Sequence, residues 1–191
     1  MNNKEFFDGI QYKIIEGHMM PEQSDHITEF LLKTPEIINV LEIGFNAGIG
    51  AACFLNARED IRVTSIDIGH NKCVPHAKEY IDKHFPGRHI LIIGDSTEKI
   101  HKINLSDINL FFIDGGHTHP IPEQDIYNCH KYSNSGDYMI IDDWCPLHGT
   151  GGVNQAIQKA LNKGILEVLD KQNMRNAGGH TRGWGIFKCL K

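Results

Sequence analysis

Five short, nearly continuous apolar runs recur along the first three quarters of this chain, and each is followed by a segment of mixed polarity. The runs are Ile38–Gly44, Arg62–Ile68, His89–Asp95, Ile108–Asp114 and Tyr138–Asp143. Runs of this length and β-branched content are typical of parallel strands that are covered on both faces. The segments between them carry apolar residues at roughly helical spacing. The alternation therefore predicts a doubly wound, Rossmann-like α/β sheet with helices on both faces.

The two ends of the chain depart from this alternation. Near the start, Ser24 is a candidate cap for a helix over 25–33, and near the end a helix over 151–164 would stop at its last glycine. Two further apolar segments, 165–172 and 183–191, have no helix between them, so we expect them to pair antiparallel. The prediction is a seven-stranded, mostly parallel sheet with a reversed C-terminal strand.

Length and composition narrow the class of protein. With 191 residues and no repeat, the chain is expected to be a single domain, 1–191, with a leader and helix over 1–37 and a core over 38–191. A net charge of -5 argues against nucleic acid or an anionic membrane as the main partner. No signal-peptide pattern opens the chain, and no stretch reaches the about 20 apolar residues of a membrane span. The five cysteines show no paired spacing, which predicts a reducing, cytoplasmic location.

The first apolar run ends in a glycine-rich turn, "LEIGFNAGIGA". Its glycines, Gly44, Gly48 and Gly50, lack the Gly-x-Gly-x-x-Gly spacing of dinucleotide enzymes, so pyrophosphate binding is not favoured. Glu42 precedes the turn, and Asp67 ends the second run at about the 20-residue offset at which an acid can hold ribose hydroxyls. The alternative interpretation is a tight strand-to-helix connection that binds no ligand.

This turn resembles the first motif of the class I S-adenosylmethionine-dependent methyltransferases, an acid, a residue and a glycine-rich turn, here Glu42-Ile43-Gly44 and "FNAGIG". The resemblance covers most of the chain, including the reversed last strand. It implies that S-adenosylmethionine is the cofactor. The implied cofactor contacts are Gly17 in the leader, Glu42, Gly44, Phe45, Asn46 and Gly48 at the turn, Asp67 at the ribose, Asp95 and Ser96 at the adenine, and Asp114.

Three carboxylates, Asp114, Asp142 and Asp143, follow the fourth and fifth apolar runs. Parallel strands end at the same edge of a sheet, so these groups are expected to converge, where they would repel one another without a cation. Oxygen ligands suit a hard divalent ion, with Mg²⁺ first and Mn²⁺ or Ca²⁺ as alternatives. In the other interpretation, the adjacent pair is a helix cap and a solvated acid. A zinc site is a weaker alternative, with ligands His117, His119, Cys145 and His148.

The acids together with His117 resemble the metal-dependent O-methyltransferases. Their catechol-type branch has a lysine where this chain has His117, and the Asp-Gly-x-His pattern with the later Asp125 is closer to the branch that acts on sugar hydroxyls. The resemblance implies that His117 is the catalytic base. Neutral imidazole accepts the proton, so activity is expected to fall below the pKa of His117, ordinarily about 6.5. Residues expected near the acceptor are Trp144, which has a core position as its alternative, and Arg175, His180 and Arg182.

We therefore expect an S-adenosylmethionine-dependent, divalent-metal-assisted O-methyltransferase that acts on a hydroxyl of a sugar, in a glycan or a glycoside. A phenolic or catechol acceptor is the alternative among enzymes, and a non-catalytic cofactor-binding module is the alternative outside them. The glycine spacing argues against a nicotinamide-dependent dehydrogenase. The expected partner is a small-molecule or glycan acceptor, in a homodimer or within a larger glycan-processing chain.

Overall fold

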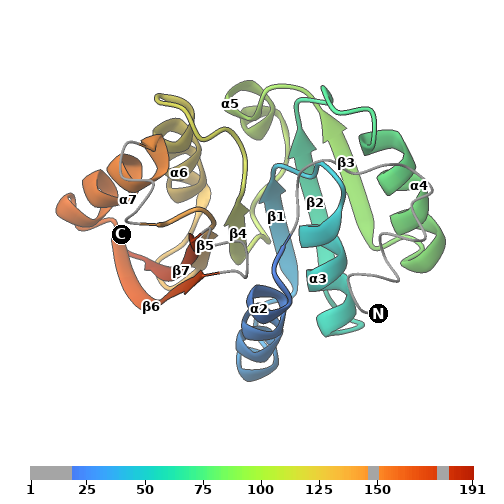
Figure 1. The fold of residues 1–191 in the computed structure, drawn as a ribbon, viewed down its shortest axis with the longest axis horizontal. Helices are drawn as coiled ribbons and strands as arrows, with labels where there is room; N and C mark the ends of the chain where they lie inside the picture. Colours follow the sequence, from blue (N-terminus) through green and yellow to red (C-terminus); the bar gives the residue numbers. More distant parts are fainter. Residues whose placement is uncertain (1–18, 146–150, 176–180) are drawn as a thin grey trace.

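The computed structural model describes residues 19–145, 151–175 and 181–191. Within these residues, seven strands form one sheet in the order β3-β2-β1-β4-β5-β7-β6 (Figure 1). The strands are β1 (Asn39–Ile43), β2 (Arg62–Asp67), β3 (His89–Ile93), β4 (Leu110–Ile113), β5 (Tyr138–Ile141), β6 (Leu166–Arg175) and β7 (Thr181–Cys189). The first five pair in parallel, and β7 pairs antiparallel with both β5 and β6. The predicted sheet and its reversed last strand are confirmed.

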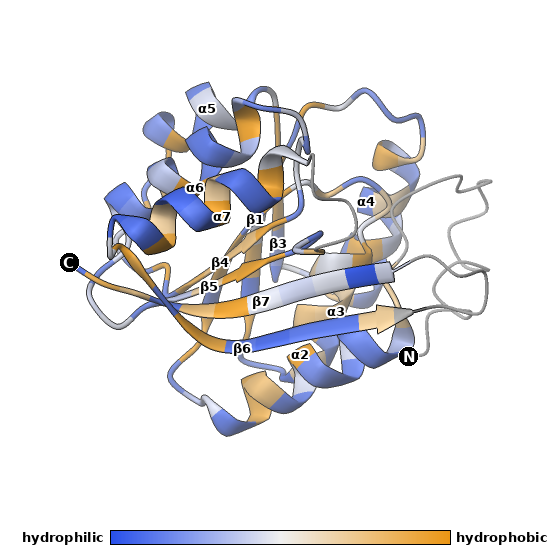
Figure 2. Cartoon of the chain, turned by 60° about the vertical axis from the view of Figure 1, so that its left-hand side comes forward, coloured by the Kyte–Doolittle hydropathy of each residue, from blue (hydrophilic) through white to orange (hydrophobic). Residues whose placement is uncertain are grey.

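Helices cover both faces of the sheet, as the alternation of apolar runs predicted. The described helices are α2 (Pro21–Lys33), α3 (Ile49–Ala57), α4 (Val74–His84), α5 (Ser96–Lys99), the 3-10 helix η1 (Ile100–Lys102), α6 (Ile121–Tyr132) and α7 (Gly152–Asn162). One apolar cluster joins the sheet to α2, α3 and α4, and a second joins its other face to α6 and α7. Figure 2 shows the apolar residues concentrated in the central strands between these two layers.

The expected helix ends have different outcomes. Ser24 is not the cap of α2, because the helix begins at Pro21, whose missing amide hydrogen suits a first helical position. The Ser24 hydroxyl instead contacts the Cys53 sulfur at 3.4 Å. The expected stop after α7 is confirmed, since the helix ends at Asn162 and Gly164 follows with a φ of 65°.

None of the described helices combines the length and the apolar character that crossing a membrane requires. All five cysteines are buried and free, in agreement with the absence of paired spacing in the sequence.

The strand order reverses between β1 and β4, which lie side by side in the middle of the sheet. In open α/β sheets such a switch point leaves a crevice outside the carboxyl ends of the strands. The glycine-rich turn follows β1 and Asp114 follows β4, so the topology brings the two main sequence features to one place.

Candidate active site

A cavity of about 920 Å³ opens at this switch point, beyond the carboxyl ends of the first five strands. The predicted site residues that line it are Gly44, Asn46, Asp67, Asp95, Ser96, Asp114, His117, Asp142, Asp143 and Arg182. The cofactor turn and the acidic residues therefore share one cavity.

The glycine-rich turn passes directly over the end of β4. Gly44 has a φ of 94°, and a Cβ at this position would lie 2.0 Å from the carbonyl oxygen of Asp114, so glycine alone fits. Asp67 holds the turn from the other side, because its Oδ2 accepts hydrogen bonds from the amides of Phe45 at 2.9 Å and Asn46 at 2.8 Å. The predicted ribose acid thus faces the cavity and also fixes the shape of the turn.

Glu42, the acid of the first motif, does not line the cavity. Its side chain is fully buried, and its Oε2 accepts a hydrogen bond from the Ser65 hydroxyl. Burial raises the pKa of Glu42 to about 8. A Cβ at Gly50, in the first turn of α3, would lie 2.2 Å from Glu42 Oε1, so the helix packs directly on this carboxyl group. Glu42 therefore supports the turn from beneath.

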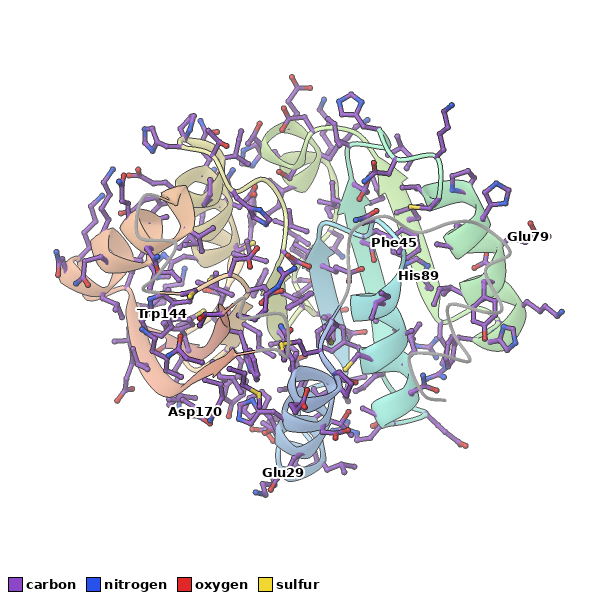
Figure 3. The ribbon with its side chains drawn as sticks, viewed as in Figure 1. Glu29, Phe45, Glu79, His89, Trp144 and Asp170 are labelled. Atoms are coloured by element: carbon purple, nitrogen blue, oxygen red, sulfur yellow. The ribbon has the colours of Figure 1, made fainter. Side chains whose placement is uncertain are left out.

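Phe45 and Gly48 also lie outside the cavity lining, so their implied cofactor contacts stay predictions. Phe45 is buried and stacks on His89, with ring centroids 4.9 Å apart (Figure 3). Gly48 precedes α3 with a φ of 76°, and a Cβ there would lie 2.9 Å from the Phe45 ring. His89 Nε2 lies 2.9 Å from the Ser65 hydroxyl, and burial lowers the pKa of His89 to about 4. Sequence reasoning missed this buried Ser65–His89 support.

Asp114, His117 and Asp143 form the one group of potential metal-binding side chains found within the described residues. Their ligand atoms all lie within 4.8 Å of one another. His117 Nε2 lies 2.9 Å from Asp143 Oδ2 and 3.8 Å from Asp114 Oδ1. The neighbouring carboxylates of Asp114 and Asp143 raise the pKa of His117 to about 10. In this arrangement of side chains alone, His117 therefore carries a positive charge between the two carboxylates.

Asp142 lies beside this group, but a different element holds it. The buried Gln23 of α2 donates a hydrogen bond from Nε2 to Asp142 Oδ1 at 2.9 Å. Burial, and then repulsion from Asp114 and Asp143, raises the pKa of Asp142 well above its ordinary value. The structure groups His117 with Asp114 and Asp143, and Asp142 lies beside them, so the expected ligand set of three aspartates stays a prediction.

The two residues expected on the adenine side begin α5 at the cavity wall. Asp95 caps the helix by accepting a hydrogen bond from the Thr97 amide at 2.8 Å. The Ser96 hydroxyl donates to Asp125 Oδ1 at 2.7 Å. Asp125 is buried in α6, and burial raises its pKa to about 6. The later aspartate of the sequence pattern thus supports Ser96 and does not itself line the cavity.

The residues expected near the acceptor have divided outcomes. Arg182 lines the cavity, and its Nη1 donates to Asp143 Oδ1 at 3.3 Å. Trp144 does not line the cavity; its indole packs on Phe187 of β7, with ring centroids 5.1 Å apart, which is the core alternative. Gly17, His180 and the side chain of Arg175 lie outside the described residues.

The zinc alternative gains no support from the described residues. His119 pairs with Glu123, with His119 Nδ1 3.5 Å from Glu123 Oε2, and Cys145 is buried outside the acidic group. His148 lies outside the described part of the chain.

Further cavity residues had not been predicted as site residues, among them Ile68, His70, Asn71, Gly151, Val153 and Thr181. His70 and Asn71 follow the end of β2, so the strand-end rule that identified Asp67 would have identified them as well. Val153 and Thr181 begin α7 and β7, and their approach to the cavity depends on tertiary packing that no local pattern reports.

Comparison with known proteins identifies the class of protein to which this fold and cavity belong. Residues 41–144 match the family model described as a methyltransferase domain, and the chain belongs to this family. No characterised protein sequence matches the chain.

Several solved structures share the fold. An O-methyltransferase from Bacillus cereus in complex with SAH has a TM-score of 0.81 and 17% identity, over 98% of this chain and 90% of that one. The O-methyltransferase TomG from Streptomyces achromogenes, in complex with SAM, has a TM-score of 0.80 and 14% identity, over 100% and 92%. A SAH-bound methyltransferase from Podospora anserina has a TM-score of 0.76 and 12% identity, over 98% and 87%. The fold is that of class I S-adenosylmethionine-dependent methyltransferases, as the sequence resemblance implied.

Proposed function

We propose that this protein is an S-adenosylmethionine-dependent O-methyltransferase that is assisted by a divalent cation and acts on a sugar hydroxyl. The observation that carries the proposal is that the turn held by Asp67 and the group of Asp114, His117 and Asp143 line one cavity. Its volume of about 920 Å³ lies within the usual range of about 300–1,000 Å³ for small-molecule sites.

The residues divide into a cofactor side and an acceptor side. When bound, S-adenosylmethionine supplies a methyl group on a sulfonium sulfur, and a divalent cation supplies the charge that lowers the pKa of a neighbouring hydroxyl. Gly44 lines the cavity at the turn, Asp67 offers a carboxylate to ribose hydroxyls, and Asp95 with Ser96 forms the adenine-side wall. The acidic group then belongs to the acceptor side, where alignment and proton removal are needed.

The donor set fits a divalent cation. The two carboxylates of Asp114 and Asp143 suit Mg²⁺ or Mn²⁺, and burial raises the pKa of Asp114, so negative charge is costly here without a compensating cation. In the described geometry His117 provides that compensation. With a cation held by Asp114 and Asp143, His117 no longer has to carry the charge, and its imidazole is free to take the proton of the acceptor hydroxyl.

The cavity wall favours a sugar over a planar phenol. None of the described lining residues is Phe, Tyr or Trp, the side chains that offer a stacking face to an aromatic acceptor. Asn46, Thr181 and Arg182 offer hydrogen-bonding groups that suit the several hydroxyls of a sugar. A cytoplasmic location is part of the proposal, because all five cysteines are free thiols.

A labelling experiment tests the proposal. The protein is incubated with methyl-labelled cofactor and a panel of free sugars, glycosides and catechols, in the presence of Mg²⁺, Mn²⁺ or a chelator. We expect transfer to a sugar that the chelator abolishes and either ion restores. Full activity in chelator would contradict the role of the cation, and transfer to catechols alone would contradict the sugar acceptor.

A matched pair of histidine variants tests the base. His117→Ala should be far slower than His119→Ala, because His119 is exposed, does not line the cavity and pairs with Glu123. Equal rates for the two variants would remove His117 from the mechanism.

A further inference from the structure

We propose that Trp144 is a positioning residue: seated on Gly183 and Gly185 of β7, it holds Asp143 in the left-handed conformation that directs its carboxylate at His117. The inference rests on the proposed function, because Asp143 is one of the two carboxylates that would hold the cation. Trp144 does not line the cavity, so it acts through Asp143.

The backbone of Asp143 is unusual. Its φ of 56° lies in the left-handed region, which costs free energy for any residue with a Cβ and persists where the surroundings enforce it. The backbone is anchored on each side of the Asp143-Trp144 pair. The Asp142 amide donates to the Ile113 carbonyl of β4 at 3.0 Å, and the Cys145 carbonyl accepts from Asn154 Nδ2 of α7 at 2.6 Å. The Cys145 amide also donates to the Asp143 carbonyl at 2.8 Å, which closes a tight turn around Trp144.

Two glycines of β7 make room for Trp144. A Cβ at Gly183 would lie 2.3 Å from the Trp144 carbonyl oxygen, and a Cβ at Gly185 would lie 2.5 Å from Cε3 of its indole. Neither glycine has a positive φ, so both are needed for space and not for conformation. We call this pair the β7 slot. Any side chain in the β7 slot would push Trp144, and the turn that follows Asp143, off the sheet.

Two further side chains hold the indole of Trp144. Lys171 Nζ lies 3.7 Å from the centre of the ring, and the Phe187 ring packs beside it. Both the backbone and the indole ring of Trp144 are therefore fixed. The adjacent Asp143 cannot return to the usual φ range without breaking these contacts of Trp144. In the held geometry, Asp143 Oδ2 lies 2.9 Å from His117 Nε2, and Oδ1 accepts from Arg182 of the same strand, β7.

Titration with Mn²⁺ by calorimetry tests the inference, using the full chain saturated with S-adenosylhomocysteine. Trp144→Ala and Gly183→Ala should each weaken Mn²⁺ binding by at least about tenfold, the lower end of the ~10–100-fold loss found for residues that support metal ligands. The affinity for S-adenosylhomocysteine should not change. Trp144→Phe keeps a ring over Gly185 and should retain most of the Mn²⁺ affinity.

Trp184→Phe is the matched control. Trp184 is buried on the opposite face of β7 and donates to His26 Nδ1 at 2.9 Å, so this variant should lower the melting temperature and leave Mn²⁺ binding unchanged. Wild-type Mn²⁺ affinity in both Trp144→Ala and Gly183→Ala would overturn the inference. If Trp144→Ala does not fold, Gly183→Ala decides, because it keeps the tryptophan side chain and displaces the Trp144 backbone from the β7 slot.

Absence of Mn²⁺ binding by the wild type would be a failure of the proposed function, and a metal-free measurement then judges the inference. The ¹⁵N chemical shift of His117 Nε2 reports its contact with Asp143. A change of that shift in Trp144→Ala that Trp184→Phe lacks would support the positioning role, and an unchanged shift would overturn it.

Discussion

Glu42→Gln should make the protein more stable than the wild type at pH 8, by an amount that shrinks as the pH is lowered toward 4.5. Burial raises the pKa of Glu42 from 4.5 to about 8, so the folded protein favours the neutral acid. The stability that this group contributes is fully present below pH 4.5 and is lost as the pH rises through the folded pKa near 8. Glutamine is neutral at every pH, keeps the volume and keeps an oxygen that can accept the Ser65 hydrogen bond.

The size of the effect follows from the two pKa values. The rise from 4.5 to about 8, at 1.36 kcal/mol for each pH unit, corresponds to roughly 5 kcal/mol at pH 8. Local relaxation lowers the cost of a buried charge, so we expect a measured difference of about 2–5 kcal/mol. Near pH 4.5 the wild type and the variant should have similar free energies of unfolding, apart from a pH-independent offset.

Urea unfolding of both proteins between pH 4.5 and 8 measures this difference directly. Calorimetry with S-adenosylhomocysteine is the second arm, and it should show unchanged affinity because Glu42 does not line the cavity. A difference in unfolding free energy that stays flat across the pH range would refute the neutral buried acid. A loss of affinity in Glu42→Gln would contradict the expectation of unchanged affinity.

Three further substitutions have expected outcomes. His89→Gln should remove a pH dependence of stability that is opposite in sign to that of Glu42. Burial lowers the pKa of His89 from 6.5 to about 4, so the wild type should lose about 3 kcal/mol of unfolding free energy relative to the variant as the pH falls through that range. A difference in unfolding free energy that does not change with pH would contradict this. Asp67→Ala should weaken S-adenosylhomocysteine binding by about 1.5–3 kcal/mol in calorimetry, because a charged acceptor is lost; unchanged affinity would remove the ribose assignment. Gly44→Ala should lower the melting temperature far more than Gly164→Ala, since both glycines have positive φ but only Gly44 has the Asp114 carbonyl in the way; equal losses would argue against the close approach.

Most of the fold could be predicted from the sequence, because buried parallel strands leave a strong local pattern. Each of β1 to β5 lies inside one of the five apolar runs, and the two C-terminal segments without a helix between them pair antiparallel as expected. The start of α2 was misplaced because a capping serine and an N-terminal proline predict different first residues, and the helix begins at the proline, Pro21.

The candidate site was predictable as a place and less so as a set of contacts. The carboxyl ends of strands at a switch point lie around one crevice, independently of the direction of each side chain. Asp67, Asp95 and Asp114 lie at such strand ends, and all three line the cavity. Glu42 and Phe45 belong to the same motif, yet their side chains point into buried contacts with Ser65 and His89. The direction of a side chain depends on the neighbours packed against it, which come from distant parts of the sequence.

For the pair Asp142-Asp143, the alternation of side chains along a strand predicts part of the observed geometry. Side chains of a strand alternate between its faces, so two adjacent aspartates at the end of β5 cannot both continue toward the same neighbours. Ile140 belongs to the apolar cluster on the α2 side, and Asp142, two residues later, meets Gln23 of that helix. By the same alternation, Asp143 belongs to the opposite face of the sheet, and its left-handed φ of 56° directs its carboxylate to His117. Alternation alone would have separated the two acids; the conformation of Asp143 depends on the β7 slot, about 40 residues further along the chain, and no local pattern around Asp143 reports it.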